Sequence, residues 1–99
     1  MSGMACAEIK RGEHKAPGGK LLRCALMSNG KIRGIKITGD FFMHPEERIV
    51  DLEQRLIGVP LRKKEIEKIV TDFFEEVVVV GASAKDFVSL ILKTRGRGA

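Results

Sequence analysis

The sequence predicts an α+β domain in which a small antiparallel sheet packs against three helices. An Asn-Gly pair separates two alternating stretches, and three amphipathic stripes with helical spacing follow residue 45. The chain has 99 residues, enough for one domain with a single modest core. We therefore expect a hairpin with one or two further short strands, and three helices on one face of that sheet.

The hairpin over residues 20–41 is the clearest element. Asn29-Gly30 is the favoured pair for a two-residue type I′ turn. A turn closed there predicts three opposed pairs, namely Ser28 with Lys31, Cys24 with Ile35 and Leu22 with Ile37. By the period-two rule one face is apolar, with Leu22, Cys24, Leu26, Ile35 and Ile37. The opposite face carries Arg23, Lys36 and Thr38, and we expect it to be solvated or interfacial.

The chain before the hairpin is less regular. Residues 1–12 alternate weakly, with Ala5, Ala7 and Ile9 on one side, which predicts an N-terminal segment or an edge strand. Residues 13–20 are interpreted as a loop, because Pro17 favours extended geometry before it and two glycines permit positive φ. The single domain is expected over residues 13–94, followed by a flexible Arg-Gly tail over 95–99.

Three helices are predicted after the hairpin. The first begins near Pro45, with two glutamates behind it, and ends at Gly58. The second covers about residues 61–74, with an apolar stripe of Ile66, Ile69, Val70, Phe73 and Phe74. The third follows a capping-box pattern over 83–86, in which Asp replaces the usual Glu or Gln. Periodicity leaves open whether residues 77–80 form a short buried strand or an extended linker.

Composition narrows the classes of function. The net charge of +5 and the pI near 9.5 favour phosphate-bearing or acidic partners without choosing among them. Because Tyr and Trp are absent and Phe occurs five times, an aromatic platform for nucleic acid is poorly supported. No apolar run approaches the roughly 18 residues of a membrane span, and no signal peptide is visible, so we expect a cytoplasmic protein.

The residues that carry chemistry form no active-site pattern. His14 and His44 are the two histidines, and with Cys6 and Cys24 they make no zinc spacing. We expect Cys24 to be a buried thiol, and the sequence leaves open whether Cys6 is a free surface thiol or pairs with Cys24 in a disulfide. The Gly18–Lys20 segment lacks the frame of a phosphate loop and leads into a strand. We therefore assign no catalytic residue and no metal ligand.

Several motifs, in order, are similar to one family. The stretch KIRGIKITGDFF over residues 31–42 resembles the hairpin strand and "GDFF"-like strand end of the C-terminal accessory domain of lipoate–protein ligases. DLEQRLIGV over 51–59 and SAKDFVSL over 83–90 resemble the helices that follow it, and HKAPGGKL over 14–21 resembles its entry. The resemblance spans about residues 13–92 and implies a fold like that of SufE/NifU-like scaffold and sulfur-transfer proteins.

The resemblance also implies a division of labour. In that family a separate catalytic domain binds lipoate and ATP, makes lipoyl-adenylate, and transfers lipoyl to a lysine of a carrier protein. The 99-residue chain has no room for that domain. It therefore resembles the non-catalytic small subunit of a bipartite, archaeal-type ligase, which forms a heterodimer with the catalytic subunit and meets the carrier indirectly. Lipoate and ATP would bind to the complex, and no cofactor to this chain alone.

The hairpin register suggests where a partner would bind. Residues 20 and 39 are opposed in the predicted register, so the Pro-Gly-Gly loop and the GDFF element meet at one end. We expect this end to form the partner or activation interface, with Gly18, Gly19, Lys20, Gly39, Asp40, Phe41 and His44. The simpler alternative is that the glycines turn the chain and Asp40 caps it. One ring of the Phe41-Phe42 pair is expected in the core and the other half-exposed.

Two other functions stay open on sequence alone. The positive charge and the Arg-Gly tail would also suit a small nucleic-acid-binding module, whose binding should weaken steeply with salt. A sulfur-transfer adaptor would need a reactive Cys6 or Cys24.

Overall fold

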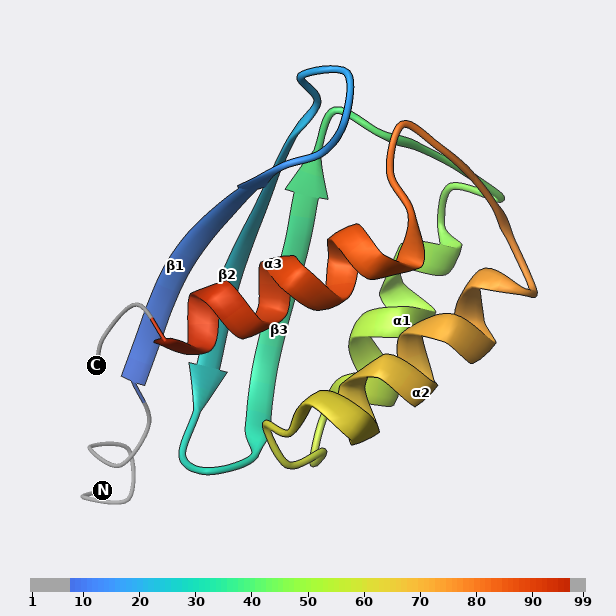
Figure 1. Ribbon diagram of the computed structural model, residues 1–99. Coiled ribbons are helices and arrows are strands. Elements are labelled where there is room, and N and C mark those ends of the chain that lie inside the picture. The colour runs from blue at the N-terminus through green and yellow to red at the C-terminus, as the bar shows by residue number, and fades with distance from the viewer. Residues whose placement is uncertain (1–7, 97–99) are drawn as a thin grey trace.

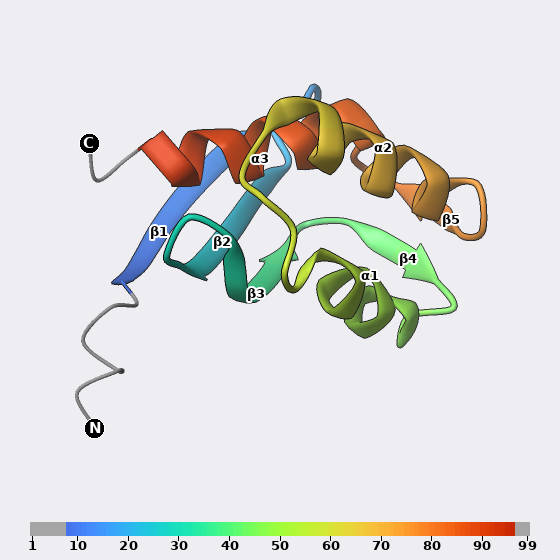
Figure 2. The same cartoon turned by 90° about the horizontal axis from the view of Figure 1, so that it is seen from below.

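The computed structural model describes residues 8–96, and the predicted α+β class is confirmed (Figure 1). In chain order the elements are β1 (Glu8–Lys15), β2 (Leu21–Ser28), β3 (Ile32–Gly39), β4 (Phe42–His44), α1 (Arg48–Leu56), α2 (Lys63–Phe74), β5 (Val78–Val80) and α3 (Ala84–Gly96). An antiparallel sheet has the order β1-β2-β3, and β4 and β5 form a separate two-stranded ribbon. Helix α3 crosses β1 and β2, α1 packs on β3, and α2 contacts both helices (Figures 1 and 2).

The predicted hairpin exists, but its register differs by two residues. Cys24 lies opposite Ile37, not Ile35, and Leu22 lies opposite Gly39, not Ile37. A register irregularity at Met27/Ser28 accompanies the change, and Ser28 pairs with Ile32. The cause lies beyond the turn: Lys31 forms a bridge with Pro60, and the Ile32 amide donates to the Val59 carbonyl over 2.9 Å. The segment after α1 therefore draws the start of β3 away from a tight two-residue turn.

The apolar face survives this shift because an even displacement keeps every side chain on its side of the sheet. Leu22, Cys24, Leu26 and Ile37 are buried, and Ile35 is partly buried. Together with the helices they form one core, whose largest fully buried side chains include Phe73, Phe87, Leu52, Leu56, Ile66, Leu90 and Ile91. The buried thiol predicted for Cys24 is confirmed, whereas Cys6 lies outside the described residues.

The first strand is longer than predicted. Residues 13–15, expected in a loop, belong to β1, and the connecting loop is reduced to residues 16–20. An edge strand is present, but Ile9 is 56% exposed and lies on the face away from the helices. Gly12 and His14 face α3 instead, so the usual apolar signal is missing from this strand. β1 runs without a break across residues 12 and 13, and Ala5 and Ala7 lie outside the described residues.

The three helices form where the sequence predicts them, with shifts at some of their ends. The capping box is confirmed: the Ser83 amide donates to Asp86 Oδ2 over 2.9 Å, and the Asp86 amide donates back to Ser83 Oγ over 3.3 Å. α1 begins at Arg48, a turn later than Pro45. α3 extends to Gly96 and so includes Arg95, which was expected in the tail. The open alternative at residues 77–80 is decided in favour of a strand, although Val78 and Val80 are exposed, not buried.

The outer edge of β3 is covered. The buried Glu53 carboxylate of α1 accepts a hydrogen bond from the Ile37 amide over 2.9 Å. At the start of the same strand, the Gly58 amide donates to the Ile32 carbonyl over 2.6 Å. These bonds occupy backbone groups that an added strand would need, so β3 is a poor edge for pairing with another chain.

Candidate partner interface

Six of the seven predicted interface residues lie at one end of the sheet, in the β1–β2 loop and the GDFF element, whereas His44 lies in the separate β4–β5 ribbon. The β1–β2 loop carries Gly18 and Gly19, with φ of 90° and 83°, and ends at the exposed Lys20. β3 ends beside it, because the Asp40 amide donates to the Leu21 carbonyl over 3.0 Å. Figure 1 shows both turns at the same end of the sheet. The observed register differs from the predicted one by two residues, so Gly39 lies opposite Leu22 and not Lys20, but the β1–β2 loop and the GDFF element are still neighbours.

Glycine is required where the backbones cross. At Gly39, with φ of 153°, an added Cβ would lie 2.6 Å from the Leu21 carbonyl oxygen. At Gly81, with φ of 102°, it would lie 3.0 Å from the Asp40 carbonyl oxygen. By contrast, an added Cβ at Gly18 or Gly19 would meet nothing within 4 Å, so those two residues are needed only for their positive φ. Gly81 was not predicted, and it brings the β5–α3 loop against the interface.

The side chain of Phe41 points into the core, and that of Phe42 points into solvent. Phe41 is partly buried and meets Phe87 edge to face, with ring centroids 5.2 Å apart. Phe42 is 76% exposed, so it is more open than the half-exposed ring expected from the sequence. Asp40 is exposed like Lys20, and no ion pair joins the two among the described side chains. Both charges are therefore available to a partner.

The β4–β5 ribbon adds an apolar surface that the sequence did not reveal. Phe42 lies opposite Val80, and His44 lies opposite Val78. Phe42, Val78 and Val80 are all at least 60% exposed, whereas Met43 on the inner face is buried. We call the outer face, with Phe42, Val78 and Val80, the ribbon patch, and the exposed His44 lies at its border. Because exposed apolar side chains are grouped here, the ribbon patch is a candidate contact surface.

Ion pairs hold the start of the ribbon in place. Glu76, just before β5, accepts hydrogen bonds from Arg48 over 2.6 Å and from Arg55 over 2.7 Å, both on α1. The hydrogen bonds from Arg55 and then Arg48 lower the pKa of Glu76. Since β4 precedes α1 directly, these contacts tie both strands of the ribbon to the same helix. The patch therefore sits on a supported element and not on a free loop.

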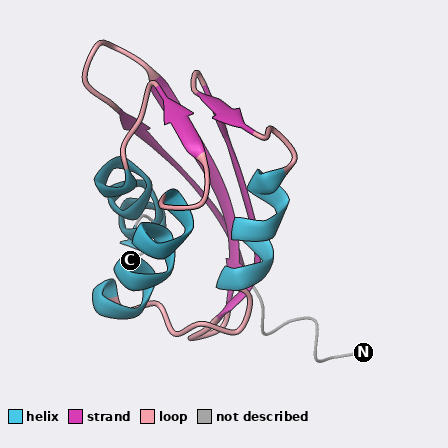
Figure 3. Ribbon diagram, turned by 90° about the vertical axis from the view of Figure 1, so that its right-hand side faces the viewer, coloured by secondary structure: helices cyan, strands magenta, loops and turns pink. Residues whose placement is uncertain are grey.

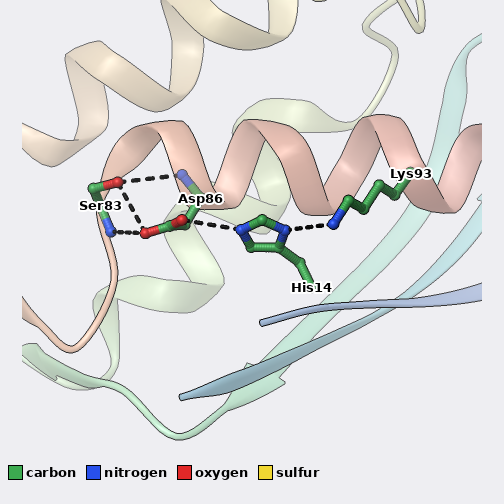
Figure 4. A network of polar contacts seen from close by, with 4 residues as sticks. All are labelled: His14, Ser83, Asp86 and Lys93. Carbon is green, nitrogen blue, oxygen red and sulfur yellow. Dashed lines mark hydrogen bonds and ion pairs between the residues drawn. The ribbon is translucent and has the colours of Figure 1, made fainter. Parts of the chain in front are cut away.

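His14, the other histidine, lies near the end of β1, opposite Leu22, and its imidazole contacts two side chains of α3 (Figure 4). Its Nε2 lies 3.0 Å from Asp86 Oδ1, and its Nδ1 lies 2.8 Å from Lys93 Nζ. An ammonium can only donate, so Nδ1 accepts and the ring proton is on Nε2. Burial raises the pKa of Asp86, but hydrogen bonds from His14 and Ser83 outweigh it and the net shift is downward.

This network does not form a nucleophilic triad. The Ser83 hydroxyl contacts Asp86 and not the imidazole, so no base is placed to take its proton. Cys24 is no better as a nucleophile, because burial raises the pKa of its thiol to about 11. Residues 8–96 contain no group of three or more His, Cys, Asp or Glu side chains that could hold a metal ion. No helix in the same range is long and apolar enough to cross a membrane.

Comparison with known proteins decides the family. The family model described as "Bacterial lipoate protein ligase C-terminus" matches residues 8–91. The chain belongs to this lipoate protein ligase C-terminal family. It is 38% identical over 73 residues to lipoate-protein ligase A subunit 2 of Thermoplasma acidophilum, covering 72% of this chain and 76% of that protein.

A solved structure shows the same fold. It comes from a structural analysis of an archaeal lipoylation system, a bi-partite lipoate protein ligase and its E2 lipoyl domain from Thermoplasma acidophilum. The match has a TM-score of 0.76 and 33% identity, covering 86% of this chain and 96% of that chain. The resemblance seen in the GDFF element and the following helices is thus confirmed, and the chain is identified with the C-terminal, accessory part of a lipoate protein ligase.

Proposed function

We propose that this chain is the accessory subunit of a bipartite lipoate–protein ligase. It binds a separate catalytic subunit and is needed for the ATP-dependent activation of lipoate to lipoyl-AMP, which precedes transfer to a lysine of a carrier protein. Lipoate and ATP bind to the assembled complex, and the chain is not catalytic alone. The observation that carries this proposal is the fold match, which covers 96% of a chain from a bi-partite ligase.

The geometry supports a docking role. The ribbon patch exposes three large apolar side chains, and Lys20 and Asp40 lie at the adjoining end of the sheet. Stable subunit interfaces have an apolar centre and a polar rim. The ribbon patch would supply the centre and the two charges would supply the rim. A sulfur-transfer role is less well supported, because Cys24 is buried and its pKa is raised to about 11.

Activation can be tested directly by pyrophosphate release. The purified chain, incubated with lipoate and ATP, is expected to release none, whereas a catalytic subunit from the same organism should become active when the chain is added. Pyrophosphate release by the chain alone, or equal release by the catalytic subunit with and without it, would contradict the proposal.

The polar rim is tested with a Lys20→Ala, Asp40→Ala double variant. Both side chains are exposed, so the variant should fold. It should lose stimulation of lipoyl-AMP formation, while transfer from preformed lipoyl-AMP by the catalytic subunit continues. The matched control is Lys68→Ala, Asp72→Ala, which removes the same residue types from an exposed pair on α2. A folded Lys20/Asp40 variant that stimulates as well as the control would move the interface to another surface.

The apolar centre is tested with Phe42→Asp, which places a charge at the large apolar side chain that is most exposed among the described residues. A central apolar contact contributes about 2 kcal/mol or more, so the dissociation constant for the catalytic subunit should rise at least about 30-fold. Ile57→Asp is the control, because Ile57 is 41% exposed at the end of α1, outside the ribbon patch. Equal affinities of the two variants would show that the ribbon patch is not the contact.

A further inference from the structure

The sheet has a second surface that the proposed docking site does not use. The face of β1, β2 and β3 turned away from α3, which we call the open face, can be followed in the ribbons of Figures 2 and 3. The register places three rows of side chains on it. The register gives these rows as Ile9–Met27–Gly34, Arg11–Ala25–Lys36 and Glu13–Arg23–Thr38. The open face therefore has an apolar row at one end and charged rows beside it.

The small central residues hollow this face. Two adjoining depressions share Arg11, Ala25 and Lys36 in their linings, so they form one groove across the central strand. Ala25 forms the floor, with Gly34 at the apolar end. Strands are about 4.8 Å apart, so the Arg11 and Lys36 backbones stand about 10 Å apart on either side of Ala25. That spacing admits a side chain of another molecule between two cations.

The charge of the groove is not neutralised internally. Arg23 pairs with Glu13 over 3.5 Å, but Arg11 and Lys36 make no ion pair among the described side chains, and both are exposed. The neighbouring row is apolar, with Ile9 56% and Met27 37% exposed. No aromatic side chain lies in these rows, so bases would have nothing to stack on. Carboxylates beside a small apolar side chain are the chemistry that fits, and this is the chemistry of an acidic protein surface.

The two surfaces of the molecule suit different kinds of contact. Permanent subunit interfaces are more apolar, as the ribbon patch is, whereas charged surfaces chiefly steer association and allow rapid release. In the proposed reaction the catalytic subunit stays bound, but the carrier protein must arrive and leave in every turnover. We propose that the open face recruits the acceptor carrier protein, with carboxylates of the carrier between Arg11 and Lys36 and an apolar side chain on Ile9 and Met27.

This inference depends on the proposed function, and its test separates the two. The assembled ligase is given lipoate, ATP and an unmodified lipoyl domain, and the half-saturating concentration of lipoyl domain is measured at about 0.05 M salt. In the Arg11→Glu, Lys36→Glu variant this concentration should rise at least about tenfold, and the difference should shrink as salt is added. Lipoyl-AMP formation without the lipoyl domain should stay at the wild-type rate.

Two further variants make the result specific. Lys63→Glu, Lys64→Glu changes the net charge by the same amount on exposed positions of α2, away from the open face. It should leave the half-saturating concentration within about twofold of wild type. Arg11→Ala, Lys36→Ala removes the cations without adding acids and should show a smaller rise than the double reversal, which guards against misfolding of the first variant.

Three outcomes would overturn the inference. Equal rises in the open-face and α2 reversals would show a net-charge effect only. Loss of lipoyl-AMP formation in the open-face reversal would assign the groove to the catalytic subunit instead. Unchanged saturation in both open-face variants would leave the groove without a role in carrier recruitment. If wild-type chain does not stimulate lipoyl-AMP formation at all, it is the proposed function that fails.

Discussion

Replacing Gly12 by Ala should destabilise the protein because α3 packs directly onto the β1 backbone at this residue. An added Cβ would collide with Thr94 Oγ1 and would lie 2.9 Å from Thr94 Cα. The second contact is with backbone, so rotating a side chain cannot relieve it. Thr94 is fully buried, and its hydroxyl donates to the Leu90 carbonyl over 2.8 Å. Either the strand or the helix must move.

The expected cost follows from overpacking. An extra methyl group in a close-packed site costs about 1–3 kcal/mol. Alanine also lowers the conformational entropy of the unfolded chain relative to glycine, and this offsets about 0.4–1 kcal/mol of the lost stability. The net loss should be about 1–2 kcal/mol, and for a domain of this size each kcal/mol lowers the melting temperature by about 4–8 °C.

Thermal and urea unfolding of Gly12→Ala and Gly34→Ala, followed by circular dichroism, measure this effect with an internal control. Gly34 lies in β3, and its added Cβ would make an ordinary contact of 3.6 Å with Met27 Cβ. Gly34→Ala should therefore unfold within about 0.5 kcal/mol of wild type, as surface substitutions usually do. The packing of α3 on β1 would be refuted if Gly12→Ala were as stable as Gly34→Ala.

Three further predictions concern buried and partly buried side chains. Phe73→Ala should cost about 3–5 kcal/mol and Ile69→Ala clearly less, since Phe73 is fully buried and Ile69 only partly; equal losses in urea unfolding would contradict this. Because the pKa of Asp86 lies below its ordinary 3.8, its contribution is present above that pH and is lost as pH falls through the lower folded value. At pH 7, Asp86→Asn should therefore have a lower free energy of unfolding than wild type, and it should lose less stability than wild type on acidification to pH 3. An equal stability difference between variant and wild type at both pH values, measured by urea unfolding, would contradict this prediction. In a Cys6→Ser background, Cys24 should resist iodoacetamide at pH 8 until denaturant is added, because burial raises the pKa of its thiol. Rapid labelling of the folded protein would contradict this and would support the sulfur-transfer alternative.

The elements predicted best were those in which local chemistry and core packing agree. The stripe of α2 and the capping box at Ser83 were both predictable, because helix periodicity and cap hydrogen bonds depend on residues close in sequence. The apolar hairpin face was predictable for the same reason. The register was not, because it depends on contacts of Lys31 and Ile32 with the segment after α1. The Asn29-Gly30 pair indicates only the local turn and carries no information about these long-range contacts.

The start of the fold was misjudged because β1 lacks the usual strand pattern. Its inner face is built from Gly12 against Thr94 and from His14 against Asp86, so the buried side has little apolar character. The inward orientation of a polar residue can be predicted only when its partner is known, and Asp86 is 72 residues from His14 in the sequence. The ribbon patch was missed for a related reason, since a run of four valines does not show which of them faces outward.

The GDFF element joins the core to the candidate interface. Gly39 permits the close crossing of Leu21, Asp40 closes that crossing with a backbone hydrogen bond, and Phe41 turns inward onto Phe87. Within β4 the buried Met43 points inward, so its neighbour Phe42 points outward, into the ribbon patch. One short motif therefore fixes the end of the sheet and also exposes an aromatic side chain on the candidate interface.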